Sequence, residues 1–135
     1  MSDPIDWKQR LSPLQYDILR LKGTEAPFTG AYWDTTTAGT YACAGCDTLL
    51  YRSNDKFDAG CGWPSFTQAA ASDRLLIKED LSGGRIRNEL LCAACGGHLG
   101  HIFNDGPAPT GMRHCINSAA LKFLPDDRAD ANGDK

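Results

Sequence analysis

Four of the six cysteines form two C-x-x-C pairs, the pattern with the clearest chemical meaning in the chain. Cys43 pairs with Cys46 and Cys92 with Cys95, and 45 residues separate the two pairs. Two such pairs can supply four thiolates to one tetrahedral Zn2+ at roughly 2.3 Å. Because a closed shell of four thiolates leaves no position for water or substrate, we expect a structural zinc site. Fe2+ could occupy four thiolates as well.

A second ligand set lies within one short segment. Four residues able to bind zinc follow one another there at even spacing: Cys92, Cys95, His98 and His101. This set would leave the first C-x-x-C pair without a role. A redox-active C-x-x-C of the thioredoxin type would need a βαβ context, which the sequence lacks.

The two remaining cysteines are candidates for thiol chemistry. Cys115 lies in an alternating stretch that would place it and Asn117 on one strand face, with Arg113 nearby, and a neighbouring cation favours the thiolate. Cys61 lies between two glycines, which predicts an accessible thiol in a mobile loop. Each also has an ordinary interpretation: Cys115 as a small buried core residue and Cys61 as an incidental loop thiol.

Two histidines and two aromatic residues complete the set of candidates. His98 and His101 directly follow the second C-x-x-C pair, and either imidazole could supply a proton near neutral pH. Trp63 and Phe103 would be ordinary core residues or the lining of a pocket for a small apolar group.

The elements that must position these residues are mostly short strands. Residues 6–22 carry the one convincing helical pattern, with Ser12 as N-cap, Pro13 at the first helical position, and an apolar stripe of Leu14, Ile18 and Leu21. From about residue 30 onward, short apolar runs alternate with glycine- and proline-rich turns. This texture favours an antiparallel sheet or a barrel-like sandwich.

Length and composition define a broad class. The 135 residues, 41% hydrophobic and 23% charged, predict one globular domain over residues 1–125 and a disordered polar tail over residues 126–135. The net charge of −3 gives no indication of a nucleic-acid partner, and no apolar run is long enough to cross a membrane. Because no secretory signal is visible, we expect a cytoplasmic protein. Because no interface stripe is obvious in the sequence, we expect a monomer.

Several spaced motifs together resemble the methionine-R-sulfoxide reductases, the B-type methionine sulfoxide reductases. In the family's order, the matching segments are Pro27–Trp33, Gly39–Cys46, Lys56–Phe66, Cys92–Phe103, Asp105–Pro107 and Cys115–Ser118. They span most of the chain. The resemblance implies a mainly β fold, a barrel-like pair of antiparallel sheets with short N-terminal helices and a zinc clip.

The resemblance also implies an activity and a role for individual residues. It identifies Cys115 as the nucleophile that attacks the sulfoxide sulfur and becomes a sulfenic acid. It identifies Cys61 as the resolving cysteine, whose disulfide with Cys115 is reduced by thioredoxin or another dithiol. The substrate would be the R epimer of methionine sulfoxide in oxidised peptides or proteins.

The same resemblance assigns the other site residues. It matches the four C-x-x-C cysteines to zinc ligands and matches His98, His101 and Asn117 to groups that assist the sulfoxide oxygen. Trp63 would face the substrate's methyl group, and we expect Phe103 and Arg113 to complete the substrate pocket.

One departure from the family pattern is His114, which stands where the family usually has Tyr or Phe. If alternation holds, it faces away from Cys115, and His114→Tyr should keep activity within a few-fold.

A rival prediction from another class is a zinc-ribbon-like binding module without catalysis. It accounts for the four cysteines of the two pairs. It leaves Cys61, Cys115 and the two histidines after the second pair without a role, and the acidic balance argues against a nucleic-acid partner.

Overall fold

The computed structural model describes residues 6–81, 84 and 86–125. The strands are β1 (Gly39–Cys43), β2 (Leu49–Arg52), β3 (Lys56–Phe57), β4 (Ser65–Phe66), β5 (Leu75–Asp80), β6 (Arg87–Cys92), β7 (His98–Phe103), β8 (Arg113–Ile116) and β9 (Leu121–Pro125). The helices are α1 (Trp7–Arg10), α2 (Pro13–Leu21) and the 3-10 turns η1 (Ser53–Asp55), η2 (Ser72–Arg74) and η4 (Ser118–Ala120). The expected tail, 126–135, lies outside the described residues.

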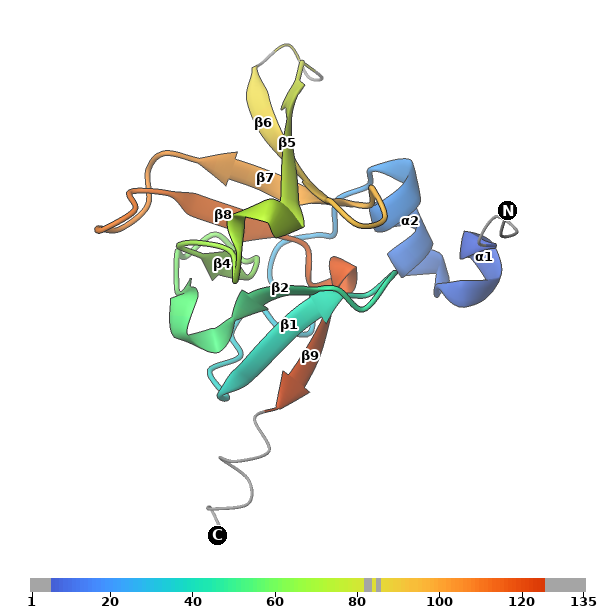
Figure 1. Cartoon of the computed structure of the whole chain (residues 1–135), viewed down its shortest axis with the longest axis horizontal. Helices are drawn as coiled ribbons and strands as arrows, with labels where there is room; N and C mark the ends of the chain where they lie inside the picture. Colours follow the sequence, from blue (N-terminus) through green and yellow to red (C-terminus); the bar gives the residue numbers. More distant parts are fainter. Residues whose placement is uncertain (1–5, 82–83, 85, 126–135) are drawn as a thin grey trace, which may run out of the picture.

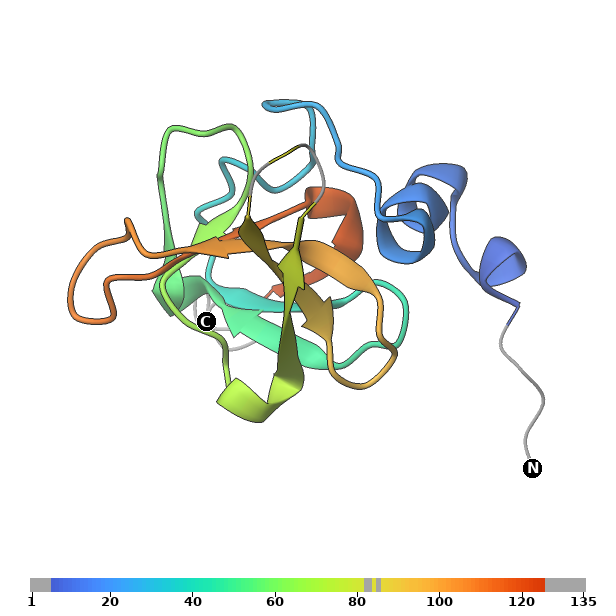
Figure 2. The same ribbon diagram turned by 90° about the horizontal axis from the view of Figure 1, so that it is seen from above.

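The strands form two antiparallel sheets, which confirms the mainly β class. One sheet has the order β2-β1-β9, and the other has the order β3-β4-β8-β7-β6-β5. Neither sheet closes on itself, and they do not join into one barrel. Figure 1 shows the β5–β6 hairpin projecting at the top of the molecule, and both views place the connection between β7 and β8 on the side away from α1 and α2 (Figures 1 and 2).

Aromatic side chains join the two sheets. Tyr41 of β1 and Tyr51 of β2 are fully buried against Phe66 of β4. The Tyr51 and Phe66 rings stack at 4.3 Å between centroids, and Tyr41 meets Phe66 edge-on at 5.2 Å. Such pairs contribute about 1 kcal/mol each beyond the burial of their apolar area. The core between the sheets therefore fixes how the three-stranded sheet lies against the six-stranded one.

The N-terminal helical segment is present but divided into two helices. Ser12 caps α2 as expected: it forms a capping box with Gln15, and Pro13 takes the first helical position. The prediction that Leu14, Ile18 and Leu21 form the buried face of this helix is wrong for Leu14 and Leu21. Leu14 and Leu21 are more than half exposed, whereas α2 buries Ile18 and Leu19. The helix rests on the core through this narrower face. No helix within the described residues has the length and apolar character needed to cross a membrane.

Candidate active site and metal centre

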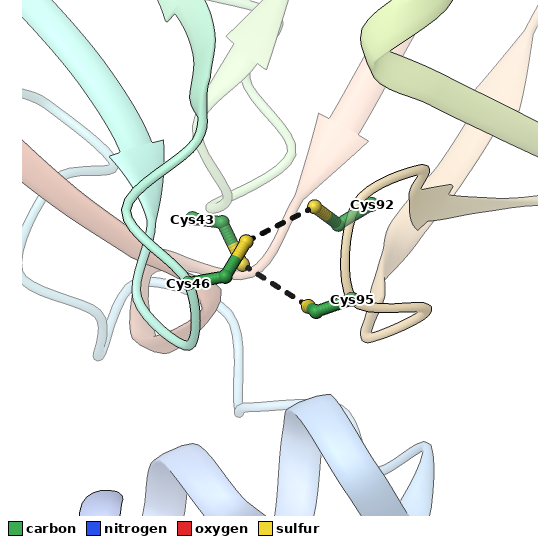
Figure 3. Close-up of side chains that lie close together, drawn as sticks. All are labelled: Cys43, Cys46, Cys92 and Cys95. Carbon is green, nitrogen blue, oxygen red and sulfur yellow. Dashed lines mark hydrogen bonds between the residues drawn. The ribbon is translucent and has the colours of Figure 1, made fainter. Parts of the chain in front are cut away.

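The two C-x-x-C pairs meet in space and form one compact cluster. All four Sγ atoms lie within 4.8 Å of one another. Cys43 Sγ lies 3.7 Å from Cys95 Sγ, and Cys46 Sγ lies 3.6 Å from Cys92 Sγ; Figure 3 shows the side chains pointing together from two loops. A tetrahedron with metal–sulfur bonds of about 2.3 Å has edges of roughly 3.8 Å. The cluster therefore fits a tetrahedral metal ion bound by four thiolates.

The backbone of both loops explains why the sulfurs converge. In the first loop, Asp47 N–H donates to Cys43 C=O and Cys43 N–H donates to Thr48 C=O. In the second loop, Gly96 N–H donates to Cys92 C=O and Cys92 N–H donates to Gly97 C=O. The two loops thus repeat one turn. Because one loop leaves β1 and the other connects β6 to β7, a bound ion would tie the two sheets together.

The other predicted site residues gather in a cavity away from this cluster. The cavity has a volume of about 340 Å³. Seven of the eight predicted catalytic and substrate residues line it: Cys61, Trp63, His101, Phe103, Arg113, Cys115 and Asn117. The eighth, His98, is not among the lining residues. Thr24, Arg87, Gly100 and Ile116 line the cavity as well, and the sequence reasoning did not select them.

Strand register places the candidate nucleophile opposite a histidine. Cys115 of β8 is the cross-strand neighbour of His101 of β7, and Phe103 is the neighbour of Arg113. Side chains of paired residues in an antiparallel sheet lie on one face about 5 Å apart at Cβ. Gly100 permits this close approach, because a Cβ there would lie 2.0 Å from the Cys115 carbonyl oxygen.

Cys61 lies on the neighbouring loop, close to the start of β4. Its Sγ lies 3.5 Å from Ser65 Oγ, and Ser65 is the cross-strand neighbour of Cys115. Burial alone would raise the pKa of Cys61, but hydrogen bonds with Ser65 and the Trp63 backbone, together with Cys115 and Arg113, bring it below its usual value. Burial, with the nearby Cys61 thiol, raises the pKa of Cys115 to about 12. Cys61 is therefore the more acidic of the two thiols.

Glu25 is a residue that sequence reasoning missed, and it organises two of the predicted ones. Its backbone N–H donates to Asn117 Oδ1 at 3.0 Å, and its C=O accepts from Trp63 Nε1 at 3.0 Å. Its buried carboxylate accepts from the N–H groups of Ser118 and Ala119. One residue thus holds both the aromatic wall and the amide of the cavity. A lone Glu in a loop segment gives no sequence signal of this role.

Arg113 and Phe103 form one wall of the cavity. The guanidinium lies over the Phe103 ring at 4.4 Å from its centroid. Asp105 accepts from Arg113 through both carboxylate oxygens, at 2.9 and 3.2 Å. This fork-like pair fixes the orientation of the guanidinium and leaves its planar face against the aromatic ring.

Each of the two neighbouring histidines has a carboxylate partner. His98 Nδ1 lies 2.6 Å from Glu89 Oε2, and His101 Nε2 lies 2.8 Å from Asp80 Oδ2. The two imidazole rings lie edge-to-face at 5.5 Å between centroids. Both carboxylates were missed, although a carboxylate inside an apolar strand such as Arg87–Cys92 is a signal of a buried polar contact.

His114 faces away from the cavity, as alternation predicted. It is buried on the opposite face of β8, where Nδ1 pairs with Tyr51 Oη at 2.9 Å and the two rings meet edge-to-face. Burial lowers the pKa of His114 to about 4. The imidazole is therefore neutral at physiological pH, and Nδ1 accepts from the Tyr51 hydroxyl when Nε2 carries the proton.

The chain is similar to the proteins of one family. Residues 11–125 match the SelR domain family. The chain is 59% identical over 119 residues to the peptide methionine sulfoxide reductase MsrB of Bradyrhizobium diazoefficiens, covering 88% of this chain and 86% of that protein. It is 52% identical to the MsrB of Agrobacterium fabrum over 120 residues, which is 89% of each chain. It is 55% identical to the MsrB of Leptospira interrogans over 118 residues, covering 87% of this chain and 90% of that protein.

Proposed function

Because the chain belongs to the SelR domain family, we propose that Cys115 and Cys61 carry out its reduction of methionine sulfoxide in peptides, acting on the R epimer. The chain is thus a thiol-dependent oxidoreductase. The observation that carries the assignment of residues is the separation of the six cysteines. Four form the metal cluster, and the remaining two line one cavity with His101, Trp63 and Asn117.

In the first step, the Cys115 sulfur attacks the sulfoxide sulfur. Because the pKa of Cys115 is raised to about 12, the thiol still carries its proton when the substrate enters. His101, opposite Cys115 in the register, takes this proton and passes it to the sulfoxide oxygen. A sulfur–sulfur bond forms as the protonated oxygen leaves the substrate sulfur as hydroxide. This hydroxide then attacks the Cys115 sulfur, the sulfur–sulfur bond breaks, methionine is released, and Cys115 becomes a sulfenic acid. The methionine sulfur gains two electrons and the Cys115 sulfur loses two.

The cavity walls supply the selectivity for one epimer. The methyl group lies against Trp63, whose ring is held by the Glu25 carbonyl, and the oxygen faces His101 and Asn117. The rest of the side chain leaves past Phe103 and Arg113. Three different groups on the sulfur thus meet three different walls, so the mirror arrangement would direct the oxygen at an apolar wall. His98, buried beside His101, supports the imidazole that faces the oxygen.

In the second step, Cys61 attacks the sulfenic acid of Cys115, a disulfide forms and water leaves. The lowered pKa of Cys61 favours this attack, because the thiolate is the nucleophile in such exchanges. A dithiol protein of the thioredoxin class then reduces the disulfide and is itself oxidised. We propose that the protein works in the cytoplasm, where reductants of the thioredoxin class keep thiols reduced.

The four clustered cysteines would hold Zn2+. Bound there, the ion supplies no reaction chemistry, because four thiolates close its coordination shell. The chain's own contacts prepare the site: Gly45 N–H donates to Cys43 Sγ, and Thr48 Oγ1 contacts Cys46 Sγ at 3.1 Å. Such contacts lower the cost of bringing four thiolates together.

The decisive experiment is reduction of the separated R and S epimers of a methionine sulfoxide peptide with dithiothreitol. We expect methionine from the R epimer only, and none from Cys115→Ser that stays folded with metal bound. No turnover of either epimer by folded, zinc-loaded protein would support the rival, a binding module without catalysis.

The resolving step is tested in the Cys61→Ser variant. In a single turnover without reductant, this variant should form one methionine per enzyme, because Cys115 is intact. With thioredoxin it should fail to cycle, because no disulfide forms. Undiminished cycling would show that another thiol resolves the intermediate.

The expected monomer stays a prediction that light scattering of the full chain can check.

A further inference from the structure

The β5–β6 hairpin supplies one carboxylate to each of the two histidines on β7. Asp80, at the end of β5, contacts His101, and Glu89, within β6, contacts His98. The strand register explains why these side chains share one face. Glu89 is the cross-strand neighbour of His101, and Asp80 is the cross-strand neighbour of Arg87, which lies two residues before Glu89 on β6. The hairpin and β7 thus build one polar layer on the face of the sheet that carries Cys115.

The Glu89–His98 contact is among the most enclosed polar contacts of the described chain. The Glu89 side chain is fully buried, His98 is 3% exposed, and Lys22 Nζ lies 3.3 Å from Glu89 Oε1 at the surface end. A buried carboxylate is costly unless it is paired. The Glu89 carboxylate is paired on both sides, with the Lys22 ammonium at one oxygen and a ring nitrogen of His98 at the other.

Ionised carboxylates accept hydrogen bonds and cannot donate them, so each pairing selects one tautomer of its imidazole. Glu89 places the proton of His98 on Nδ1, and Asp80 places the proton of His101 on Nε2. The second nitrogen of each ring then has a lone pair. His98 Nε2 is consistent with this: it is buried and has no hydrogen-bond partner among the described residues.

We propose that Asp80 and Glu89 are positioning residues that fix the tautomers of His101 and His98, so that His101 Nδ1 is free to take the Cys115 proton. This inference rests on the proposed function. In the opposite tautomer, Nδ1 would carry a proton already and could not accept the thiol proton. Asp80 also lies 3.6 Å from the Arg87 guanidinium, which helps to hold its carboxylate toward His101.

The test is Asp80→Asn in the full-length, zinc-loaded protein. The amide can donate to Nε2, which favours the wrong tautomer of His101. We expect kcat with the R epimer to fall by about tenfold or more, with KM changed much less. Long-range 1H–15N correlation spectra should show the His101 proton moving from Nε2 to Nδ1, a change that loss of stability alone does not produce.

The matched control is Glu79→Gln, one residue earlier on β5. Glu79 is exposed, and alternation directs it to the opposite face of the strand from Asp80. Glu79→Gln should keep the wild-type kcat and the wild-type histidine spectrum.

Glu89→Gln should move the His98 proton from Nδ1 to Nε2, as Asp80→Asn moves that of His101. Because Glu89 is fully buried, zinc content and thermal unfolding must show that this variant is folded.

The outcomes separate this inference from the proposed function. If wild-type protein fails to reduce the R epimer, the proposed function is wrong, whatever the tautomers. If wild type is active and Asp80→Asn keeps either its kcat or the Nε2–H tautomer of His101, the positioning role is overturned. A loss of kcat without a change of tautomer would likewise overturn the positioning role, because the effect would then come from other contacts of Asp80, such as the one with Arg87.

Discussion

The thiol pKa values of Cys61 and Cys115, which line the same cavity, are shifted in opposite directions. The hydrogen-bonding environment lowers the pKa of Cys61 against the effect of burial, whereas burial and the neighbouring thiol raise that of Cys115. Cys115, the proposed nucleophile, is therefore a protonated thiol at rest, which should protect it from unselective oxidation. In the proposed reaction, Cys115 loses this proton to His101 once a sulfoxide is bound.

This difference predicts the order in which the thiols react with a simple alkylating agent. In the reduced, zinc-loaded protein, iodoacetamide should modify Cys61 about tenfold or more faster than Cys115, because the thiolate is the reactive form. Peptide mass spectrometry after short exposures measures both rates. In Cys61→Ser, Cys115 should react faster than in wild type, since one cause of its raised pKa is gone. Faster modification of Cys115 in wild type would contradict the assigned acidities.

His114 makes stability depend on pH. Its pKa is about 4 in the folded protein and about 6.5 when unfolded, so the unfolded chain binds an extra proton between these values. The free energy of unfolding should therefore fall by about 2 kcal/mol on this account as the pH falls from about 7.5 to about 5.

The measurement is urea unfolding across that pH range for wild type and His114→Asn. The asparagine oxygen can still accept from the Tyr51 hydroxyl but does not titrate. The variant should therefore lose less stability on acidification than wild type. The difference between the two curves isolates His114 from other groups, including His98, whose pKa burial also lowers. Parallel curves would show that His114 does not carry the effect.

At the scale of elements, α2 connects the core to the metal centre. Ile18 and Leu19 are buried, and Arg20 of the same helix donates to the Cys95 carbonyl at 3.0 Å. From α1, Arg10 donates to the Gly45 carbonyl in the other metal-binding loop. Each helix therefore holds one of the two loops by a guanidinium–carbonyl hydrogen bond, in addition to the apolar contacts.

The packing of α2 is tested by two alanine substitutions one turn apart. Ile18→Ala should lower the free energy of unfolding by about 3 kcal/mol, because a fully buried side chain leaves a cavity. Leu14→Ala should cost less than about 1 kcal/mol, since that side chain is 53% exposed. Denaturant unfolding with saturating zinc compares them. Equal losses would mean that both residues pack against the core.

At the scale of the whole molecule, the metal centre is a junction between sheets. Cys43 ends β1 of the three-stranded sheet, and Cys92 ends β6 of the six-stranded sheet. Structural zinc contributes an apparent 10–16 kcal/mol in small domains, roughly as much as the whole net stability of an ordinary domain. We therefore expect a bound ion to add to the aromatic core in holding the two sheets together, and its loss to destabilise the domain.

Removing one ligand tests this dependence. Cys43→Ser should lose bound zinc, measured by metal analysis, and should lose the cooperative thermal transition. Cys61→Ser is the matched control, because it removes a thiol outside the cluster and should keep both. A native-like transition of Cys43→Ser without metal would show that packing of the aromatic core alone holds the sheets together.

The sequence by itself determined the features that depend on local spacing. Two C-x-x-C pairs predicted the metal cluster, Ser12 and Pro13 predicted the start of α2, and strand alternation placed His114 opposite to Cys115. These patterns are short-range, because a two-residue spacer, a cap or a pleat fixes geometry within a few residues. The resemblance to a known family added the pairing of Cys61 with Cys115 that spacing alone left open.

Only the tertiary structure decided which distant residues share a surface. The exposed Leu14 and Leu21 show that a helical stripe does not reveal how wide a face is buried. Nothing local indicates that Glu25 holds Trp63 and Asn117, or that the β5–β6 hairpin brings carboxylates to both histidines of β7. Strand order and register set these contacts, and both follow from how the whole chain buries its apolar surface.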